Sequence, residues 1–307
     1  MNLIVDILRA AIPAGTPLLL GTLGEIYVER SGILNLGVEG IMIMGAVTAF
    51  GVTTLTSNVW LGIFASAIAG GMMALIHAFD CVTLKANQTL SGLALTMLGL
   101  GLSGLIGKRY IGMPLSSKLQ NVPLKGLVNI PVIGPVLFDQ DPLVYISYIL
   151  AFLFWFFLFN TRFGITLRSV GESPEVADSA GINIPAIQYF AVFLGGIMSG
   201  LGGAYLSVAY APVWIEGMTA GTGWIVLAIT IFSLWRPERA ILGSYLFGGV
   251  RVLQYRLQPL GISPNILNMM PFVFTILVLM IASREISKKR IGAPASLGVS
   301  YQREKTL

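Results

Sequence analysis

Long apolar stretches alternate with short polar ones along this chain. About 20 apolar residues cross the hydrocarbon core of a bilayer, so stretches without Asp, Glu, Lys or Arg predict membrane helices. Nine are expected, near residues 3–22, 36–56, 59–79, 88–107, 143–160, 187–210, 222–235, 240–254 and 266–283. Pro13 and Pro17 interrupt the first and the eighth is short, so the count extends from eight to ten. The predicted fold class is all-α, a polytopic transmembrane helical bundle.

Composition supports a membrane protein and excludes several kinds of chemistry. The 307 residues are 55% hydrophobic and 11% charged, whereas about 25% of a soluble domain is charged. The net charge of +5 is small for this length, and the basic residues fall in loops and the C-terminal tail, which argues against nucleic-acid binding. The one cysteine, Cys81, allows no internal disulfide, and the one histidine, His77, allows no histidine metal cluster.

Basic residues near helix ends predict the orientation. With the C-terminus inside, counting back through nine helices places 12 of the 19 Lys and Arg residues on the cytoplasmic side. Residues 1–290 are then one transmembrane domain, 162–185 a cytoplasmic loop within it, and 291–307 a cytoplasmic tail. The longest connection, 108–142, contains five prolines and faces outward, either as a structured cap or as a re-entrant piece.

The polar loop 162–185 contains signals for one short helix. Ser173 can cap it, and Pro174 suits its first position. The carboxylates of Glu175 and Asp178 complement the positive end of the helix dipole. Gly181 can end the helix in a left-handed conformation. A helix of about seven residues is marginal alone, so we expect it to be held by something that it packs against.

Two polar clusters are candidates for a solute pathway, because polar groups at membrane depth are expensive. Asn35 and Glu39 are separated by four positions, so they are expected on one face of a broken or re-entrant helix. Four more polar residues open the fourth span, Asn87, Gln88, Thr89 and Ser91. For both clusters, capping or anchoring at a helix start remains an alternative to a pathway role.

Two stretches partly match nucleotide-binding motifs and one residue pair could suggest catalysis, but none of them fits the full pattern. GLGLSG at 99–104 fits a dinucleotide fingerprint but lies inside an apolar span, and GLIGKR at 104–109 lacks the first glycine and the final Ser or Thr of a phosphate loop. His77 and Asp80 share a helix face but are expected at a helix end. We predict no catalytic residue, no metal site and no cofactor in this chain.

Three stretches resemble a known family, the permease subunits of bacterial ABC importers of the branched-chain amino acid and ribose type. Within this family, the likeness is to the nucleoside and simple-sugar branch. These are ERSGILNLGVEGIMIMGA (29–46), ANQTLSGLALTMLGLGL (86–102) and GITLRSVGESPEVADSAGINI (164–184), with a looser fourth, GTGWIVLAITIFSLWRPERAILGSYLFGG (221–249). The third is the most specific.

The resemblance implies that the short helix docks in a groove of a separate ATP-binding subunit. Glu175, Ala177, Ala180 and Gly181 match the acid, small residues and glycine of the family's coupling loop, and Val176 stands where alanine is frequent. The coupling residues are expected to be Ser173, Pro174, Glu175, Val176, Ala177, Asp178, Ala180 and Gly181.

The resemblance also implies the mechanism and the partners. ATP binding, with Mg²⁺, in the partner subunit drives alternating access in the permease, which lies in the bacterial inner membrane. An external binding protein delivers the solute, and a second, different permease or a second copy completes the pathway. Nucleosides are the first expected substrate, then simple sugars, then branched-chain amino acids. A secondary carrier or channel, and an integral-membrane enzyme, are the alternative classes.

Overall fold

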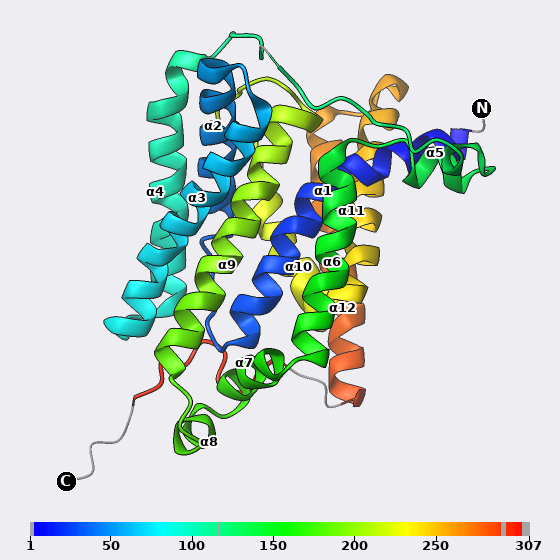
Figure 1. Ribbon diagram of the computed structural model, residues 1–307. Helices are drawn as coiled ribbons and strands as arrows, with labels where there is room; N and C mark the ends of the chain where they lie inside the picture. The colour runs from blue at the N-terminus through cyan, green and yellow to red at the C-terminus, as the bar shows by residue number, and fades with distance from the viewer. Residues whose placement is uncertain (1–2, 116, 290–292, 303–307) are drawn as a thin grey trace.

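The computed structural model describes residues 3–115, 117–289 and 293–302, and its long helices run side by side (Figure 1). Within these residues, nine longer helices correspond to the nine predicted segments: α1 (Leu3–Arg30), α2 (Val38–Thr56), α3 (Val59–Ala78), α4 (Gln88–Gly107), α6 (Pro142–Asn160), α9 (Ile184–Tyr205), α10 (Thr222–Phe232), α11 (Pro237–Leu257) and α12 (Pro264–Lys289). Three short helices complete the set: α5 (Ile133–Leu137), α7 (Arg162–Glu172) and α8 (Pro174–Ser179). Figure 1 places α5 at one end of the bundle and α8 at the other, and the two ends are named after them.

Six described helices are long and apolar enough to span a membrane, which confirms a polytopic helical bundle but falls short of nine. They contain α1, α2, α3, α4, α6 and α9. The other three depart from a simple span for different reasons. Helix α10 has only 11 residues, and α11 carries four charged side chains, Glu238, Arg239, Arg251 and Arg256. For α12 the stretch that can be assessed is limited to Asn265–Met280, which is shorter than 18 residues.

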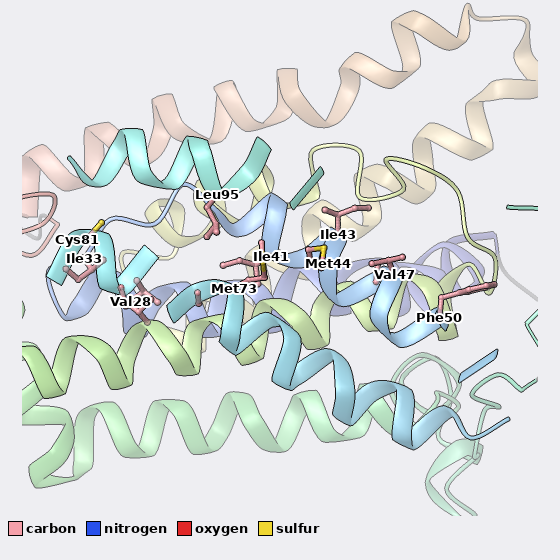
Figure 2. Packing of buried hydrophobic residues seen from close by; sticks show 14 of the residues in the cluster. Val28, Ile33, Ile41, Ile43, Met44, Val47, Phe50, Met73, Cys81 and Leu95 are labelled. Atoms are coloured by element: carbon pink, nitrogen blue, oxygen red, sulfur yellow. The ribbon is translucent and has the colours of Figure 1, made fainter. Parts of the chain in front are cut away.

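The centre of the bundle is built by α1, α2 and α9, which cross at small residues. A Cβ on Gly203 of α9 would overlap the Met42 carbonyl oxygen of α2, and one on Gly45 would overlap the Gly200 carbonyl. Close backbone approach replaces the hydrophobic drive that is missing between helices in lipid. Figure 2 shows the apolar side of this contact region, where Ile41, Met44 and other α2 side chains are buried. Helices α4 and α6 lie further out, with 33% of their apolar windows buried against 78% for α2.

The predicted boundaries of two helices are wrong because both helices include charged residues. Helix α1 continues past residue 22 to Arg30, and Glu25 and Glu29 within it are buried. Helix α11 exceeds the predicted 240–254 at both ends, where it includes the charged residues Glu238, Arg239 and Arg256. A search for uncharged stretches cuts such helices short.

The connection 108–142 forms a cap over the α5 end, which resolves the two alternatives for its described residues. The backbone of Val122 donates to the Gln140 carbonyl at 2.9 Å, and Leu124 donates to that of Phe138 at 3.0 Å. The Arg9–Asp139 ion pair, 2.5 Å, joins the cap to α1. Figure 1 shows this stretch running across the ends of the helices.

Candidate coupling surface and pathway residues

The polar loop 162–185 contains two helices where the sequence predicted one. Helix α7 precedes α8, and the Thr161 hydroxyl caps it by accepting the Gly164 N–H at 3.2 Å. Leu167 and Val170, three positions apart, are its buried side. The capping threonine and this apolar spacing are the signals that could have revealed α7.

Helix α8 has the predicted start and end, and one predicted cap is wrong. Pro174 is its first residue, and Gly181 has a φ of +80° as expected. Ser173 stands at the capping position, but its side chain makes no capping hydrogen bond; its carbonyl instead accepts the Ala177 N–H at 3.1 Å. The first turn of α8 is thus closed through the backbone.

The side chains of α8 divide into an inner and an outer set. Ala177 is 2% exposed and packs in a small cluster with Val170 and Ile184. Val176 is 68% exposed although it is apolar. Glu175, Ser179, Ala180 and Gly181 are also exposed, while Ser173, Pro174 and Asp178 are half-buried. The short helix therefore presents one apolar and one acidic side chain away from the bundle.

The C-terminal segment 293–302 packs against this region, so the short helix is held in part by its own chain. Ser296 donates to the Gly171 carbonyl through its N–H at 3.0 Å and its hydroxyl at 2.6 Å. The Tyr301 hydroxyl donates to the Asp178 carboxylate at 3.1 Å. These contacts within the chain are additional to the partner contact that the family resemblance implies. Residues 291–292 and 303–307 of the predicted tail lie outside the described part of the chain.

A groove of about 520 Å³ runs beside α8. Its lining includes Asp178, Ile182, Asn183 and Tyr301, and Lys85 from the α3–α4 connection. Partial burial lowers the pKa of Lys85 below its usual value. The groove combines an acid, a base and apolar side chains, a composition that suits contact with another protein.

Glu39, a predicted pathway residue, joins α2 to the start of α10 through hydrogen bonds. Its carboxylate accepts hydrogen bonds from the Thr219 hydroxyl at 2.6 Å, the Gly221 N–H at 2.9 Å and the Gly223 N–H at 2.6 Å. The negative charge lies at the positive end of α10 and also within the first turn of α2. These bonds compensate the cost of burying the carboxylate.

Asn35 and Glu39 do not share a helix face, because α2 begins only at Val38 and Asn35 lies in the preceding turn. The Asn35 side-chain oxygen accepts the Gly37 N–H at 2.9 Å, which stabilises this turn. Gln88 reaches the same turn and accepts the Leu34 N–H at 2.7 Å. The prediction of a common face is wrong, since the chain between α1 and α2 is not helical.

The remaining residues of the second cluster separate into different environments. The Asn87 side chain is exposed and caps α4 through the Leu90 N–H at 3.0 Å, and Thr89 is exposed. Ser91 is buried and lies 2.9 Å from both the His77 ring and the Asp80 carboxylate. Of the six predicted residues, the structure brings Asn35 and Gln88 to one turn and places Glu39 elsewhere.

The His77 ring connects three elements at the α8 end. One ring nitrogen lies 2.9 Å from the Ser91 hydroxyl of α4, and the other lies 3.1 Å from the Leu34 carbonyl. The side chain is fully buried. Both ring nitrogens are therefore engaged in structural contacts.

Sequence reasoning missed two buried acids of α1. Glu29 is 2% exposed, and its carboxylate accepts a hydrogen bond from the Trp235 indole after α10. Glu25, one turn earlier, is fully buried, and both of its oxygens lack a hydrogen-bond partner among the described residues. The four-residue spacing of the two acids was the available signal.

The described residues contain no group of three His, Cys, Asp or Glu side chains placed to hold a metal ion. Comparison with known families identifies the chain instead. A model of the permease component of branched-chain amino acid transport systems matches residues 7–282. The chain belongs to this family. It is similar to the permease subunits of nucleoside and sugar ABC transporters.

Three relatives of this permease align along almost their whole lengths. A putative glucose ABC transporter permease of Haloferax volcanii is 39% identical, covering 99% of both chains. A guanosine ABC transporter permease of Bacillus subtilis is 37% identical, covering 97% of this chain and 98% of its own. A nucleoside ABC transporter permease of Lactococcus lactis is 37% identical, covering 94% of both. No solved structure matches the chain.

The family assigns the chain its general role. It is a multi-pass permease subunit of an ABC importer in the cytoplasmic membrane, and ATP is hydrolysed in a separate subunit. ATP-binding and substrate-binding subunits are its general partners. The sequence has no nucleotide-binding motif, which agrees with ATP hydrolysis in a separate subunit.

Proposed function

We propose that this permease imports nucleosides, and that α8 is the coupling helix through which an ATP-binding subunit moves the bundle. The coupling assignment is supported by the side chains that α8 exposes away from the bundle. Val176 is 68% exposed on a six-residue helix beside a groove. An exposed apolar side chain next to an acid, on a helix too short to be stable alone, fits a protein contact.

The proposal makes the α8 end cytoplasmic and loop 162–185 the coupling loop. ATP and Mg²⁺ bind the partner subunit, and this chain holds no cofactor. We also propose that all nine longer helices lie in the membrane, with α10 as a half-length span. Glu39 supports this placement, because its carboxylate satisfies the backbone N–H groups that an interrupted helix leaves open.

Nucleosides are the first candidate substrate, because the permeases of a guanosine transporter and of a nucleoside transporter are each 37% identical to this chain across nearly its whole length. Glucose is the second candidate, since the relative at 39% is named for it. We propose a different permease chain as the second subunit, with a homodimer as the alternative, and an external binding protein that delivers the solute.

Reconstitution tests these assignments. The permease is co-expressed with an ATP-binding subunit, a second permease and a binding protein, and uptake of labelled guanosine and glucose is measured with and without ATP. We expect ATP-dependent guanosine uptake that unlabelled nucleosides compete away. Uptake that persists without ATP and stops when the proton gradient collapses would assign a secondary carrier instead. Preferred uptake of glucose would overturn the nucleoside assignment alone.

A further inference from the structure

The chain between α9 and α10 runs from the α5 end back into the bundle without forming an α-helix. After the π-helical turn Leu206–Tyr210, residues 211–221 consist of turns and extended backbone. Val213 pairs with Pro114 of the cap, so the segment begins at the α5 end. It ends at Gly221, whose N–H donates to Glu39 near the start of α2.

Contacts with glycines of α4 give the depth that the segment reaches. The Trp214 ring occupies the space of a side chain at Gly107, and a Glu216 carboxylate oxygen lies 3.1 Å from the Cβ position of Gly104. The segment ends beside Glu39, and the next residue of α2, Gly40, packs against Thr96 of α4. From Gly107 to Thr96, α4 descends roughly 16 Å at 1.5 Å per residue. Segment 211–221 thus occupies about half the thickness of the hydrocarbon core.

The segment has an exposed surface that begins near Glu216, about one helical turn below Gly107 where it contacts Gly104, and continues toward the Glu39 end. Ile215 is 58% exposed, and Glu216, Gly217 and Ala220 are also exposed. None of the described residues donates a hydrogen bond to the Glu216 carboxylate. Irregular backbone within the hydrocarbon region is stable only where it is buried in protein or lines a water-filled cavity. A carboxylate facing lipid costs several kcal/mol, so this surface does not face lipid.

We propose that segment 211–221 lines a water-filled outer half of the solute pathway, where Glu216 hydrogen-bonds the hydroxyl groups of the solute. A carboxylate has two acceptor oxygens and no donor, so it matches two neighbouring hydroxyls such as those of a ribose ring. The inference rests on the proposed function, since it assigns the specificity contact of that same pathway. The Glu39 carboxylate cannot take this role, because three groups of the protein already donate to it.

Reactivity of single cysteines tests the location. The native Cys81 is buried, and a Cys81→Ala background allows Ile215→Cys, Glu216→Cys and Ala220→Cys to be labelled individually. A charged, membrane-impermeant thiol reagent is added to cells that contain the whole transporter. Ile149→Cys on α6, 59% exposed, is the lipid-facing control. We expect labelling at all three positions, little at 149, and slower labelling at 216 with guanosine present.

Transport kinetics test the role of Glu216. Glu216→Ala is expected to raise the KM for guanosine uptake at least about tenfold, since the loss of even one hydrogen bond to a charged group has about this effect. Glu216→Asp should restore part of the affinity, and expression and subunit assembly should not change, because no hydrogen bond between described residues is removed. An unchanged KM for Glu216→Ala overturns the specificity contact.

Two further outcomes separate this inference from the proposed function. Labelling at 215, 216 and 220 that occurs only when the second permease is omitted would make the surface a subunit interface and overturn the pathway. Labelling in the complete complex without any guanosine uptake would support a hydrated pathway and overturn the nucleoside assignment.

Discussion

The backbone N–H of Gly223 donates to the Glu39 carboxylate across 2.6 Å, although 184 positions separate the two residues. We predict that Glu39→Ala lowers the free energy of unfolding by about 3 kcal/mol, because it leaves buried N–H groups unpaired. Glu39→Gln keeps one acceptor oxygen and should cost about half as much. Thermal unfolding of the purified permease measures both, and equal stability of Glu39→Ala and the native chain would contradict the capping role.

Close packing of α2 and α9 gives a prediction with a matched control. Gly203→Ala is expected to destabilise the bundle strongly, by about 3 kcal/mol, since the new methyl group would overlap the Met42 carbonyl. Gly101→Ala in α4 should be neutral or slightly stabilising, because no atom lies within 4 Å of its Cβ position. Yield and melting temperature compare the two, and similar losses in both would show that packing at Gly203 is not special.

Charge reversal on α8 tests the coupling assignment. Glu175→Lys should leave folding intact, because the side chain is exposed, and should reduce both uptake and ATPase stimulation several-fold. Glu172→Lys, also exposed but at the end of α7, is the control and should have a smaller effect. The coupling assignment is wrong if Glu175→Lys leaves uptake and ATPase stimulation unchanged.

The α1–α2 turn offers a way to separate structure from transport. Asn35→Leu and Gln88→Leu each remove an acceptor from a backbone N–H in this turn, so each should lower stability by about 1–3 kcal/mol. Assembly measured by co-purification and uptake should decline together. Assembly at native levels with uptake lost would instead favour a pathway role for these side chains.

Contact between the C-terminal segment and α8 predicts a local change in dynamics. Tyr301→Phe removes the hydroxyl that donates to Asp178, so amide exchange in residues 174–182 should become faster in the isolated permease. Exchange in α2 should not change and serves as the internal control. Identical exchange rates in 174–182 would show that the tyrosine hydroxyl does not restrain α8.

Local signals were sufficient for much of the architecture. Uncharged stretches located the nine longer helices, and the Pro174 and Gly181 pair located α8, because proline and glycine constrain the backbone without help from distant residues. Boundaries failed where the chain buries charge, as at Glu29 in α1.

Long-range partners could not be predicted. Nothing near Glu39 in the sequence indicates that Thr219 and Gly221 donate to it, and nothing near Asp178 indicates Tyr301. Such pairs are fixed by how helices pack, so they appear only in three dimensions. Assignment of the pathway residues suffered most, because a polar side chain in a span looks the same in sequence whether it caps a helix or faces water.

The position of Tyr301 against α8 has a practical consequence for work on this permease. A bulky label attached close to residue 301 would lie against Asp178 and occupy the groove beside α8, which Tyr301 lines. Loss of ATPase coupling after such labelling would report obstruction by the label. Labels are therefore better placed at the α5 end of the bundle (Figure 1).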